Sequence, residues 1–358
     1  MQKERKTIQS LQGWRAIMMF IVVVGHLFGV NLVCGGAGEV MPFFFVLSGF
    51  VLTLAYNERA EKLTLRSEAA FLSKRIRKIY PLYFLVLLVC FAYYAALSLT
   101  GRQEQSVFVY LKYFIIDTVM LQSWIPIKDY YFSLNGVAWF LSSLVFSYAL
   151  FLPFKCLTLK IRNKAGKAPA ILLCAVLLIT GVYLIVAKNV LQLEQYYTYV
   201  FPIFRAFEFF AGMVLAEIFL VRQQIKCSKK TSTILETLIL LAFAAEYIII
   251  KFALPAFGDS GYIEAVRLCL MCLLIYVFSF ENGYISKAIS NKFFLGFASI
   301  SFEVYLIHQP LQNILGTGLN QLGLKNIVGI VTLVLSVVFA YLWKKVFSII
   351  QTRKQKIK

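Results

Sequence analysis

The stretch that decides the fold is WRAIMMFIVVVGHLFGVNLV, residues 14–33, in which only Arg15 and His26 carry ionisable side chains. Twenty residues in a helix rise about 30 Å, which is the thickness of the hydrocarbon core of a bilayer. No cleavage site of the kind that follows a signal peptide is visible near this run. We therefore expect a membrane-spanning helix that the protein retains.

Apolar runs of this kind recur from one end of the chain to the other. The 358 residues are 60% hydrophobic and only 15% charged, whereas soluble domains have about 25% charged residues. The short alternating segments of a membrane β-barrel do not occur. These features predict an all-α polytopic membrane protein of about ten transmembrane helices, with a single domain over residues 1–358. The predicted spans are 14–33, 40–56, 80–99, 137–156, 170–187, 200–221, 233–252, 262–280, 295–314 and 326–348.

The net charge of +19 is distributed in a way that argues against a nucleic-acid partner. Lys and Arg gather in segments that separate successive pairs of apolar runs, and such segments mark the cytoplasmic side of a membrane protein. Both termini are therefore expected in the cytoplasm, and the basic face is expected to contact the anionic inner leaflet of the lipid bilayer. The basic segments are the N-terminus and residues 57–79, 155–167, 222–230, 282–292 and 344–358.

One apolar run, at residues 108–124, does not fit this alternation. If it crossed the membrane, the basic segment 155–167 would lie on the outer side. We therefore expect the run to be re-entrant or interfacial, because a non-spanning segment is tolerated at membrane depth where protein surrounds it.

The seven cysteines do not predict a disulfide framework, because five of them lie in apolar runs, where cysteine packs as a small hydrophobe. Cys269 and Cys272 form a CxxC, but within a predicted membrane helix, where packing is favoured over zinc binding or redox chemistry. No aspartate-rich cluster is visible near a cytoplasmic mouth either. We therefore expect no metal site.

Ionisable side chains inside a bilayer are costly and are functional candidates. The chain has two histidines, His26 and His308, and both fall within predicted spans. Arg15 and His26 are eleven residues apart, about three helical turns, so they share a helix face and lie about 16 Å apart along the axis. We expect Arg15 near the cytoplasmic entrance and His26 near mid-membrane. The alternative for each is structural: a packed histidine bonded to a carbonyl, and a snorkelling arginine.

Other polar side chains recur at helical spacing within the predicted spans. Such spacing places them on one helix face, which we expect to point into the protein. For the two acid–base pairs, mutual neutralisation is an alternative to substrate contact. The sets are Ser301, Tyr305 and His308 at i, i+4 and i+7; Arg205 and Glu208 at i and i+3; and Glu264 and Arg267 at i and i+3.

Five motifs, taken together and in order, resemble those of the acyltransferase 3 family of membrane acyltransferases. Each motif is weak evidence alone, but the five extend along most of the chain. The motifs are LQGWRAI (11–17) followed by His26, FFVLSGF (44–50), KRIRKIYP (74–81), RAFEFFAG (205–212) and ISFEVYLIH (300–308).

The resemblance implies transfer of an acyl group, most often acetyl, from cytoplasmic acyl-CoA to a carbohydrate hydroxyl on the outer side of a bacterial cell (inner) membrane. Acetyl-CoA or another acyl-CoA is then a donor substrate, and no cofactor is permanently bound. A sugar hydroxyl is a poor nucleophile at neutral pH, so a base must remove its proton, and imidazole suits this task.

The resemblance also implies roles for individual residues. His26 is expected to be the general base or, alternatively, a covalent carrier of the acyl group. Arg15 is expected to orient the donor or stabilise the developing oxyanion, with His308 as a further catalytic group. The cations expected to hold the CoA phosphates are Arg75, Arg77 and Lys78, and the residues expected to contact substrate are Ser48, Arg205, Glu208, Ser301 and Tyr305.

The chain departs from the family pattern in three places. Lys78 stands where a second arginine is usual, and lysine keeps the charge but loses the bidentate fork. Residues 139–144, WFLSSL, lack the acidic residue that some members carry after the tryptophan. Glu39 and Pro42 alter the approach to the second span.

Two other classes of function stay open on the residues alone. A transporter or a flippase of a lipid-linked sugar would also bury Arg, Glu and His along a path through a helical bundle. A structural subunit of an envelope assembly is the third class. Neither accounts for the five motifs together, and consumption of a thioester distinguishes an enzyme from both.

Overall fold

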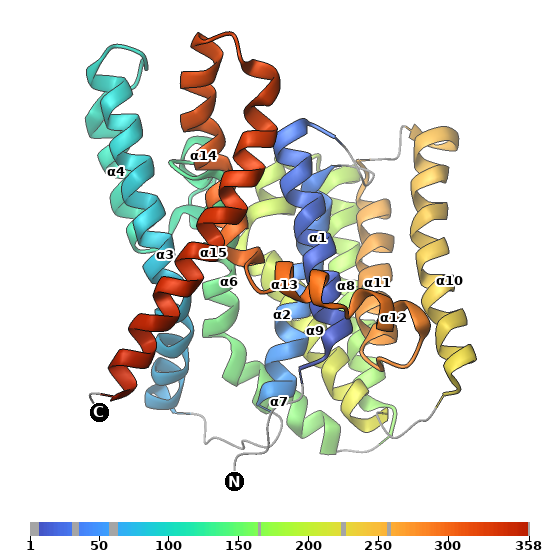
Figure 1. The fold of residues 1–358 in the computed structure, drawn as a ribbon. Helices are drawn as coiled ribbons and strands as arrows, with labels where there is room; N and C mark the ends of the chain where they lie inside the picture. Colours follow the sequence, from blue (N-terminus) through green and yellow to red (C-terminus); the bar gives the residue numbers. More distant parts are fainter. Residues whose placement is uncertain are drawn as a thin grey trace.

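The computed structural model describes residues 7–30, 36–56, 64–163, 166–222, 227–255 and 259–356. Within these ranges the chain forms helices and no strand, which confirms the predicted fold class. Figure 1 shows a bundle in which the first turn of α1 and the last turns of α15 lie at the same end. The α-helices are α1 (Gln9–Phe28), α2 (Met41–Ala55), α3 (Leu65–Leu99), α4 (Val107–Thr118), α5 (Lys128–Tyr131), α6 (Trp139–Ala149), α7 (Phe151–Asn163), α8 (Ala168–Ile185), α9 (Pro202–Arg222), α10 (Lys229–Ile248), α11 (Gly261–Phe278), α12 (Tyr284–Ile289), α13 (Lys292–Ala298), α14 (Ser301–Gln321) and α15 (Val328–Lys356).

Seven of the described helical segments are long and apolar enough to cross a bilayer, and a bent pair of helices adds an eighth. The chain is therefore polytopic, but the predicted count of ten spans is not confirmed. The predicted spans 200–221 and 295–314 correspond to α9 and α14, which are not among these segments. α9 carries several charged side chains, and α14 carries a histidine, a proline and several amides. The segments are Gln9–Phe28, Gly38–Ala55, Arg66–Leu99, Ala168–Val190, Lys229–Ala253, Gly261–Phe278, Lys325–Ile349 and the pair Gly136–Ala149 with Phe151–Arg162.

The polar helix α9 lies inside the bundle. It packs against α2, α6, α7, α8 and α11, and 14 of its 21 residues are buried. The apolar helix α10, by contrast, has only 17% of its apolar window buried, and it stands at the edge of the bundle in Figure 1. Because a charged group in hydrocarbon is costly unless it is paired, apolar helices face the lipid and α9 is kept from it.

The predicted span 137–156 is divided into two helices. α6 and α7 meet at a bend of 51°. A buried carboxylate holds α7 against α9, since Glu217 lies 2.6 Å from Lys155 Nζ and 2.9 Å from Arg162 Nη1. The sequence shows one apolar run here, whereas the ion pairs fix the direction of its second half.

The third predicted span, at residues 80–99, starts much earlier in the structure. α3 begins at Leu65, where Thr64 caps its first turn by accepting a backbone hydrogen bond of 3.1 Å. The predicted start was therefore wrong, because Pro81 lies inside the helix and does not begin it. As a consequence, the basic residues 75–78 lie on a continuous helix of 35 residues, about 52 Å long.

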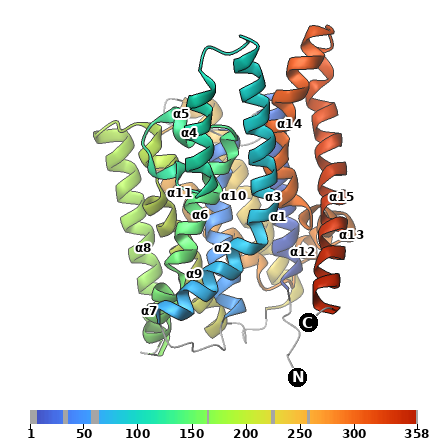
Figure 2. The same cartoon turned by 90° about the vertical axis from the view of Figure 1, so that its left-hand side faces the viewer.

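The run at 108–124 forms only the short helix α4, whose 12 residues rise about 18 Å. The hydroxyls of Tyr80 and Tyr83 on α3 donate to the carbonyls of Thr118 (3.0 Å) and Asp117 (2.6 Å) at its end. Figure 2 shows α4 beside the upper part of α3. This length agrees with the expectation that the run does not cross the membrane by itself.

Two glycines bring the backbones of α2 and α9 into contact. A Cβ atom on Gly49 would lie 2.0 Å from the carbonyl oxygen of Phe209, and one on Gly212 would lie 1.9 Å from that of Val46. Small residues permit such close approach between membrane helices. Both glycines belong to motifs quoted above, so part of what those motifs encode is helix packing around α9.

Replacing Gly212 by Ala is expected to lower the thermal unfolding temperature of the protein in detergent. Helix propensity alone favours alanine over glycine by about 1 kcal/mol, but the new methyl group would collide with backbone, which can shift only with strain. Gly318→Ala is the matched control, because nothing lies within 4 Å of its added Cβ. If both variants unfold at the temperature of the wild type, the proposed packing constraint is wrong.

Candidate active site

The two histidines of the chain lie in contact. Nδ1 of His26 on α1 is 2.9 Å from Nε2 of His308 on α14, and the two rings are nearly parallel, with an interplanar angle of 5°. His308 is fully buried, and His26 is half-buried. The sequence predicted both as functional candidates, but no local pattern indicates contact between residues 282 positions apart.

The hydrogen bonds of this pair define its tautomers. His308 Nδ1 lies 3.2 Å from the carbonyl oxygen of Val304, and a carbonyl requires a donor, so His308 carries its proton on Nδ1. In the neutral ring Nε2 is then an acceptor, and His26 donates to it from Nδ1. This leaves Nε2 of His26 unprotonated. Because of this contact, His26 has the tautomer of a general base.

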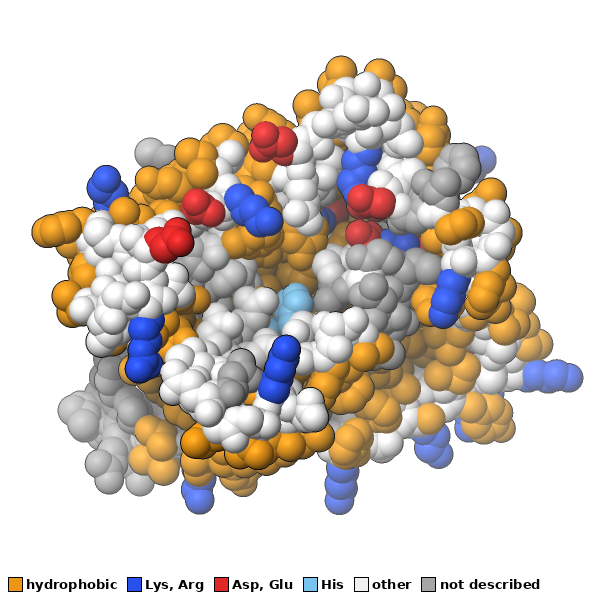
Figure 3. All heavy atoms as spheres, turned by 90° about the horizontal axis from the view of Figure 1, so that it is seen from above, with side chains coloured by type: hydrophobic (Ala, Val, Ile, Leu, Met, Phe, Trp, Pro, Cys, Tyr) orange, Lys and Arg blue, Asp and Glu red, His pale blue; other side chains and the backbone are white. Residues whose placement is uncertain are grey.

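The histidine pair opens toward the face of the bundle opposite the chain termini. Figure 3 looks down on that face and shows a hollow with a histidine side chain at its floor. This side chain is His26, because the chain has two histidines and His308 is 0% exposed. A ligand on this face can therefore reach His26 but not His308.

A loop ahead of α6 is fixed against the His308 helix. Tyr305, whose ring centroid lies 6.0 Å from that of His308, donates its hydroxyl to Val137 O at 2.8 Å. Asn135 Nδ2 donates to Leu306 O at 3.0 Å. Tyr305 was predicted to contact substrate, but its hydroxyl already donates to the carbonyl oxygen of Val137. Asn135 was not predicted, since an isolated Asn before an apolar run is normally assigned to a turn.

Arg15 lies at the other end of α1, which is one continuous helix through His26. Its Nη2 donates to the carbonyl oxygen of Ala298, and the hydroxyl of Ser301 donates to the same oxygen at 2.9 Å. The Nε of Arg15 is buried and has no hydrogen-bond partner among the described residues. Ser301, predicted to contact substrate, therefore groups with Arg15 and not with the histidine pair.

A basic patch surrounds Arg15. We use this name for Arg15, Lys78 and Lys344, which lie around the carboxylate of Glu303, together with Arg75, which lies beside Lys78. Lys78 is within electrostatic range of Arg15, Arg75 and Glu303, and Glu303 is also within range of Lys344. Three cations around one carboxylate, with a fourth beside Lys78, form an electropositive site, which favours an anionic ligand.

The basic motif divides between two faces of α3. The Arg75 guanidinium lies 5.5 Å from the ring of Tyr56 and 5.3 Å from that of Phe71, and its Nε is buried without a partner among the described residues. Arg77 is exposed, and it points away because residues two apart do not share a helix face. The structure therefore brings Arg75 and Lys78, but not Arg77, into the basic patch.

Ser48 also lies near the basic patch. Its hydroxyl lies beside that of Tyr148, and Tyr148 is in turn within electrostatic range of Arg75. Ser48 was predicted to contact substrate without a stated side of the membrane. Its neighbours indicate the basic end of the site, away from His26.

Arg205 and Glu208 form a buried ion pair at 2.6 Å, with side chains 3% and 2% exposed. Arg205 Nε also donates to Tyr199 O at 2.7 Å. The second carboxylate oxygen of Glu208 has no hydrogen-bond partner among the described residues. The guanidinium faces four aromatic rings at 5.1–5.7 Å, those of Phe45, Trp139, Tyr199 and Phe204. Arg205 and Glu208 therefore neutralise each other, which was the structural alternative given for their spacing. One carboxylate oxygen of Glu208 remains without a hydrogen-bond donor among the described residues.

The five motifs thus contribute the histidine pair, most of the basic patch and the buried ion pair. The acyltransferase domain that defines the acyltransferase 3 family matches residues 8–344 of the chain. The protein belongs to this family. The match includes every residue of the sites described above, so the chain is a membrane acyltransferase. No curated protein and no solved structure shows a significant match to it.

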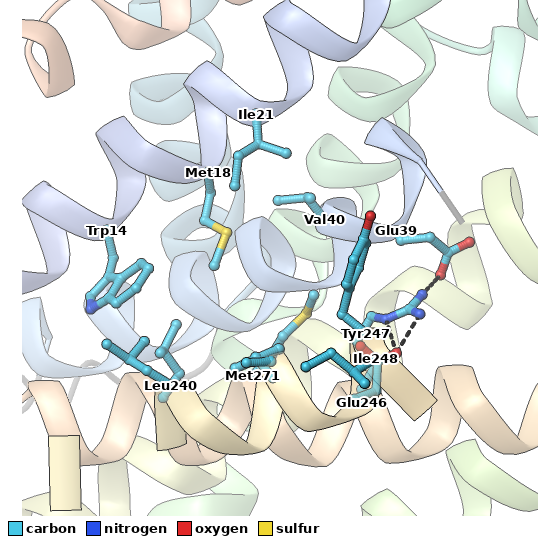
Figure 4. A pocket seen from close by; sticks show the side chains of 14 residues that line it. Trp14, Met18, Ile21, Glu39, Val40, Leu240, Glu246, Tyr247, Ile248 and Met271 are labelled. Carbon is cyan, nitrogen blue, oxygen red and sulfur yellow. Dashed lines mark hydrogen bonds and ion pairs between the residues drawn. The ribbon is translucent and has the colours of Figure 1, made fainter. Parts of the chain in front are cut away.

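The second acid–base pair of this acyltransferase is not the one its spacing indicated. Arg267 pairs with Glu39 and with Glu246, at 2.6 Å for the latter, while Glu264 pairs with Lys188. Glu39, which departs from the family pattern, therefore has a structural role here. Figure 4 shows Glu39 and Glu246 on either side of the Arg267 guanidinium.

An apolar cavity of about 340 Å³ adjoins this ion-paired cluster. Trp14, Met18 and Ile21 line it (Figure 4), and they occupy the side of α1 away from Arg15 and His26. Among the residues that the structure describes, its lining includes no histidine or cysteine. The cavity is therefore separate from the histidine pair.

Three carboxylates nearby have the proximity of a metal site, and each is paired with a protein cation. Oxygens of Glu39, Asp259 and Glu264 lie within 4.8 Å of one another. Lys188 Nζ is 2.7 Å from Asp259 and also pairs with Glu264, and Arg267 pairs with Glu39. The cations Lys188 and Arg267 are each shared between two carboxylates.

Removing one partner of the Arg205–Glu208 pair is expected to destabilise this acyltransferase more than removing both. Arg205→Met leaves a buried, unpaired carboxylate, a change that costs about 3–5 kcal/mol, whereas replacing a whole buried pair is often neutral. The thermal unfolding temperature in detergent should fall for Arg205→Met and recover in Arg205→Met with Glu208→Gln. A double variant at least as unstable as Arg205→Met would contradict this assignment.

Proposed function

We propose that this acyltransferase moves an acyl group, in the simplest case acetyl, from acyl-CoA in the cytoplasm to a hydroxyl of a carbohydrate on the other side of the membrane. The observation that carries the proposal is the arrangement along α1. Its first turns lie in the basic patch, and its last turn carries His26 in the opposite hollow. One continuous helix thus links a site for an anionic donor to a site for a general base.

The end of the bundle with the basic patch faces the cytoplasm in this proposal. The first turn of α1 and the end of α15 lie at that end (Figure 1), and the basic segments of the sequence favour the cytoplasmic side for both termini. The membrane is then the bacterial cell (inner) membrane, where acyl-CoA is available on the cytoplasmic side alone.

Donor binding follows from the charges of the basic patch. The phosphates of CoA are anions, and Arg75 and Lys78 place a guanidinium and an ammonium on one face of α3 for them. Lys78 acts as a point charge and not as a fork. Arg15 is positioned to orient the anionic donor as it enters, since it lies about 16 Å along α1 from His26, where the thioester carbonyl reacts.

The catalytic step uses the lone pair on His26 Nε2. This nitrogen removes the proton of the sugar hydroxyl as the oxygen attacks the thioester carbonyl carbon. The C–S bond then breaks, and the CoA thiolate takes the proton from His26, so an ester and free CoA are the products. The alternative also uses Nε2, which would attack the thioester first and carry the acyl group to the sugar.

A transporter or flippase of a lipid-linked sugar is the rival function. The buried charges that would favour it are engaged in pairs: Arg205 with Glu208, and Arg267 with Glu39 and Glu246. Such ion pairs are expected in a protein where they only stabilise the fold as much as in a transporter where they line a translocation path. Thiol release therefore remains the measurement that separates the two functions.

His26→Ala is expected to abolish glycan-dependent thiol release from acetyl-CoA. A general base contributes about 10²–10⁴-fold, so the rate should fall by at least about 100-fold in purified protein that unfolds at the wild-type temperature. His308→Phe should lower kcat with little change in either KM, because His308 acts on His26 and not on substrate. Full activity of His26→Ala would refute the role of this residue.

Lys78→Ala is expected to raise the KM for acetyl-CoA, because one of the cations facing the CoA phosphates is lost. Lys78→Arg should restore or lower that KM, since a guanidinium can form a bidentate contact with phosphate. Lys167→Ala is a control, since this exposed lysine lies at the start of α8 outside the basic patch. Equal effects of Lys78→Ala and Lys167→Ala would place the donor elsewhere.

A further inference from the structure

A polar cleft opens beside the histidine pair, formed by residues that none of the five motifs includes. It lies between the ends of α1, α3, α14 and α15 and has a volume of about 670 Å³, within the range of about 300–1,000 Å³ found for small-molecule sites. Most of its lining side chains carry a hydroxyl, amide or ammonium group. Those used below are Tyr93, Tyr94, Gln103, Gln312, Asn313 and Lys325.

The cleft is one helical turn from the histidines. Gln312 follows His308 by four residues, so the two share a face of α14 and lie about 6 Å apart along the axis. Leu27, which also lines the cleft, directly follows His26. Gln312 Nε2 donates to Leu27 O at 3.4 Å. This hydrogen bond links α1 to α14 on the side of the cleft nearest the histidine pair.

The side chains of the cleft are already held in place. The Tyr93 hydroxyl donates to Asn313 O at 3.0 Å and contacts the Thr317 hydroxyl. Asn313 Nδ2 donates to the Tyr94 hydroxyl at 3.2 Å. The rings of Tyr93 and Tyr94 lie 5.1 Å apart, edge to face. Groups fixed in this way lose little entropy when a ligand binds.

We propose that this cleft binds the carbohydrate acceptor and presents one of its hydroxyls to His26. A sugar offers hydroxyls on its edges and C–H groups on its faces. Amides and tyrosines match both, because they combine hydrogen-bonding groups with flat apolar surface. Lys325 is charged, and among the described residues no carboxylate lines the cleft, so a neutral or acidic saccharide fits and an aminated, cationic one does not.

The test measures the KM for acceptor, and it rests on the proposed acyl transfer. The probes are methyl glycosides of glucose, galactose, N-acetylglucosamine and glucuronic acid, with thiol release from acetyl-CoA as the readout. Tyr94→Ala and Asn313→Ala should each raise the KM for the accepted glycoside about tenfold and leave the KM for acetyl-CoA unchanged. Tyr262→Ala is the control, since this exposed tyrosine lies at the start of α11, outside the cleft.

The outcomes separate this inference from the proposed function. If the wild type releases thiol and both cleft variants keep the wild-type KM for glycoside, the cleft is not the acceptor site, while acyl transfer stands. If the wild type releases no thiol with any glycoside, saturation-transfer NMR with the same glycosides tests the cleft alone. Binding lost in Tyr94→Ala and Asn313→Ala but kept in Tyr262→Ala supports the inference, and equal or absent binding overturns it.

Discussion

The constraint on which this structure depends is the cost of a charge in hydrocarbon. α9 carries Arg205, Glu208 and Glu217, and each of these charges has an ion-pair partner within the bundle. Arg205 and Glu208 pair with each other, and Glu217 pairs with Lys155 and Arg162 of α7. These pairs require neighbours on several sides, so α9 lies inside and apolar helices such as α10 take the lipid-facing positions. Glycines in α2 and α9 then allow the close approach that completes this arrangement.

The same constraint explains why the candidate site has two ends. Arg15, Lys78 and Lys344 lie around Glu303, with Arg75 beside Lys78, at one end of α1. The neutral histidine pair lies at the other end, where His308 is fully buried. A site that must hold an anion and also perform proton transfer separates the two tasks, because phosphates beside an imidazole would favour its charged, non-basic form. The length of α1 provides this separation.

The sequence predicted what depends on local pattern: the all-α membrane fold and the shared face of Arg15 and His26. It did not predict what depends on contacts between distant segments. The third span was predicted to start at residue 80, although the helix begins at the Thr64 cap, sixteen residues earlier. Glu264 was paired with Arg267 by spacing, but Lys188 and Glu39 from other elements took those positions. Neither the Thr64 cap nor the ion pairs of Glu264 and Arg267 produce a periodic pattern in the sequence.

The histidine pair accounts for the missing acid after Trp139. In a Ser-His-Asp triad the carboxylate holds the proton of the base on Nδ1 and orients the ring. Here His308 Nε2 accepts the hydrogen bond from the Nδ1–H of His26. Val304 O accepts a hydrogen bond from His308 Nδ1 and so orients the His308 ring in turn. Two imidazolium rings 2.9 Å apart would repel each other, so the pair holds one extra proton at most. One proton is what the proposed reaction requires, since in it the hydroxyl gives one and the CoA thiolate takes it back. A buried carboxylate would add only a charge that needs a partner.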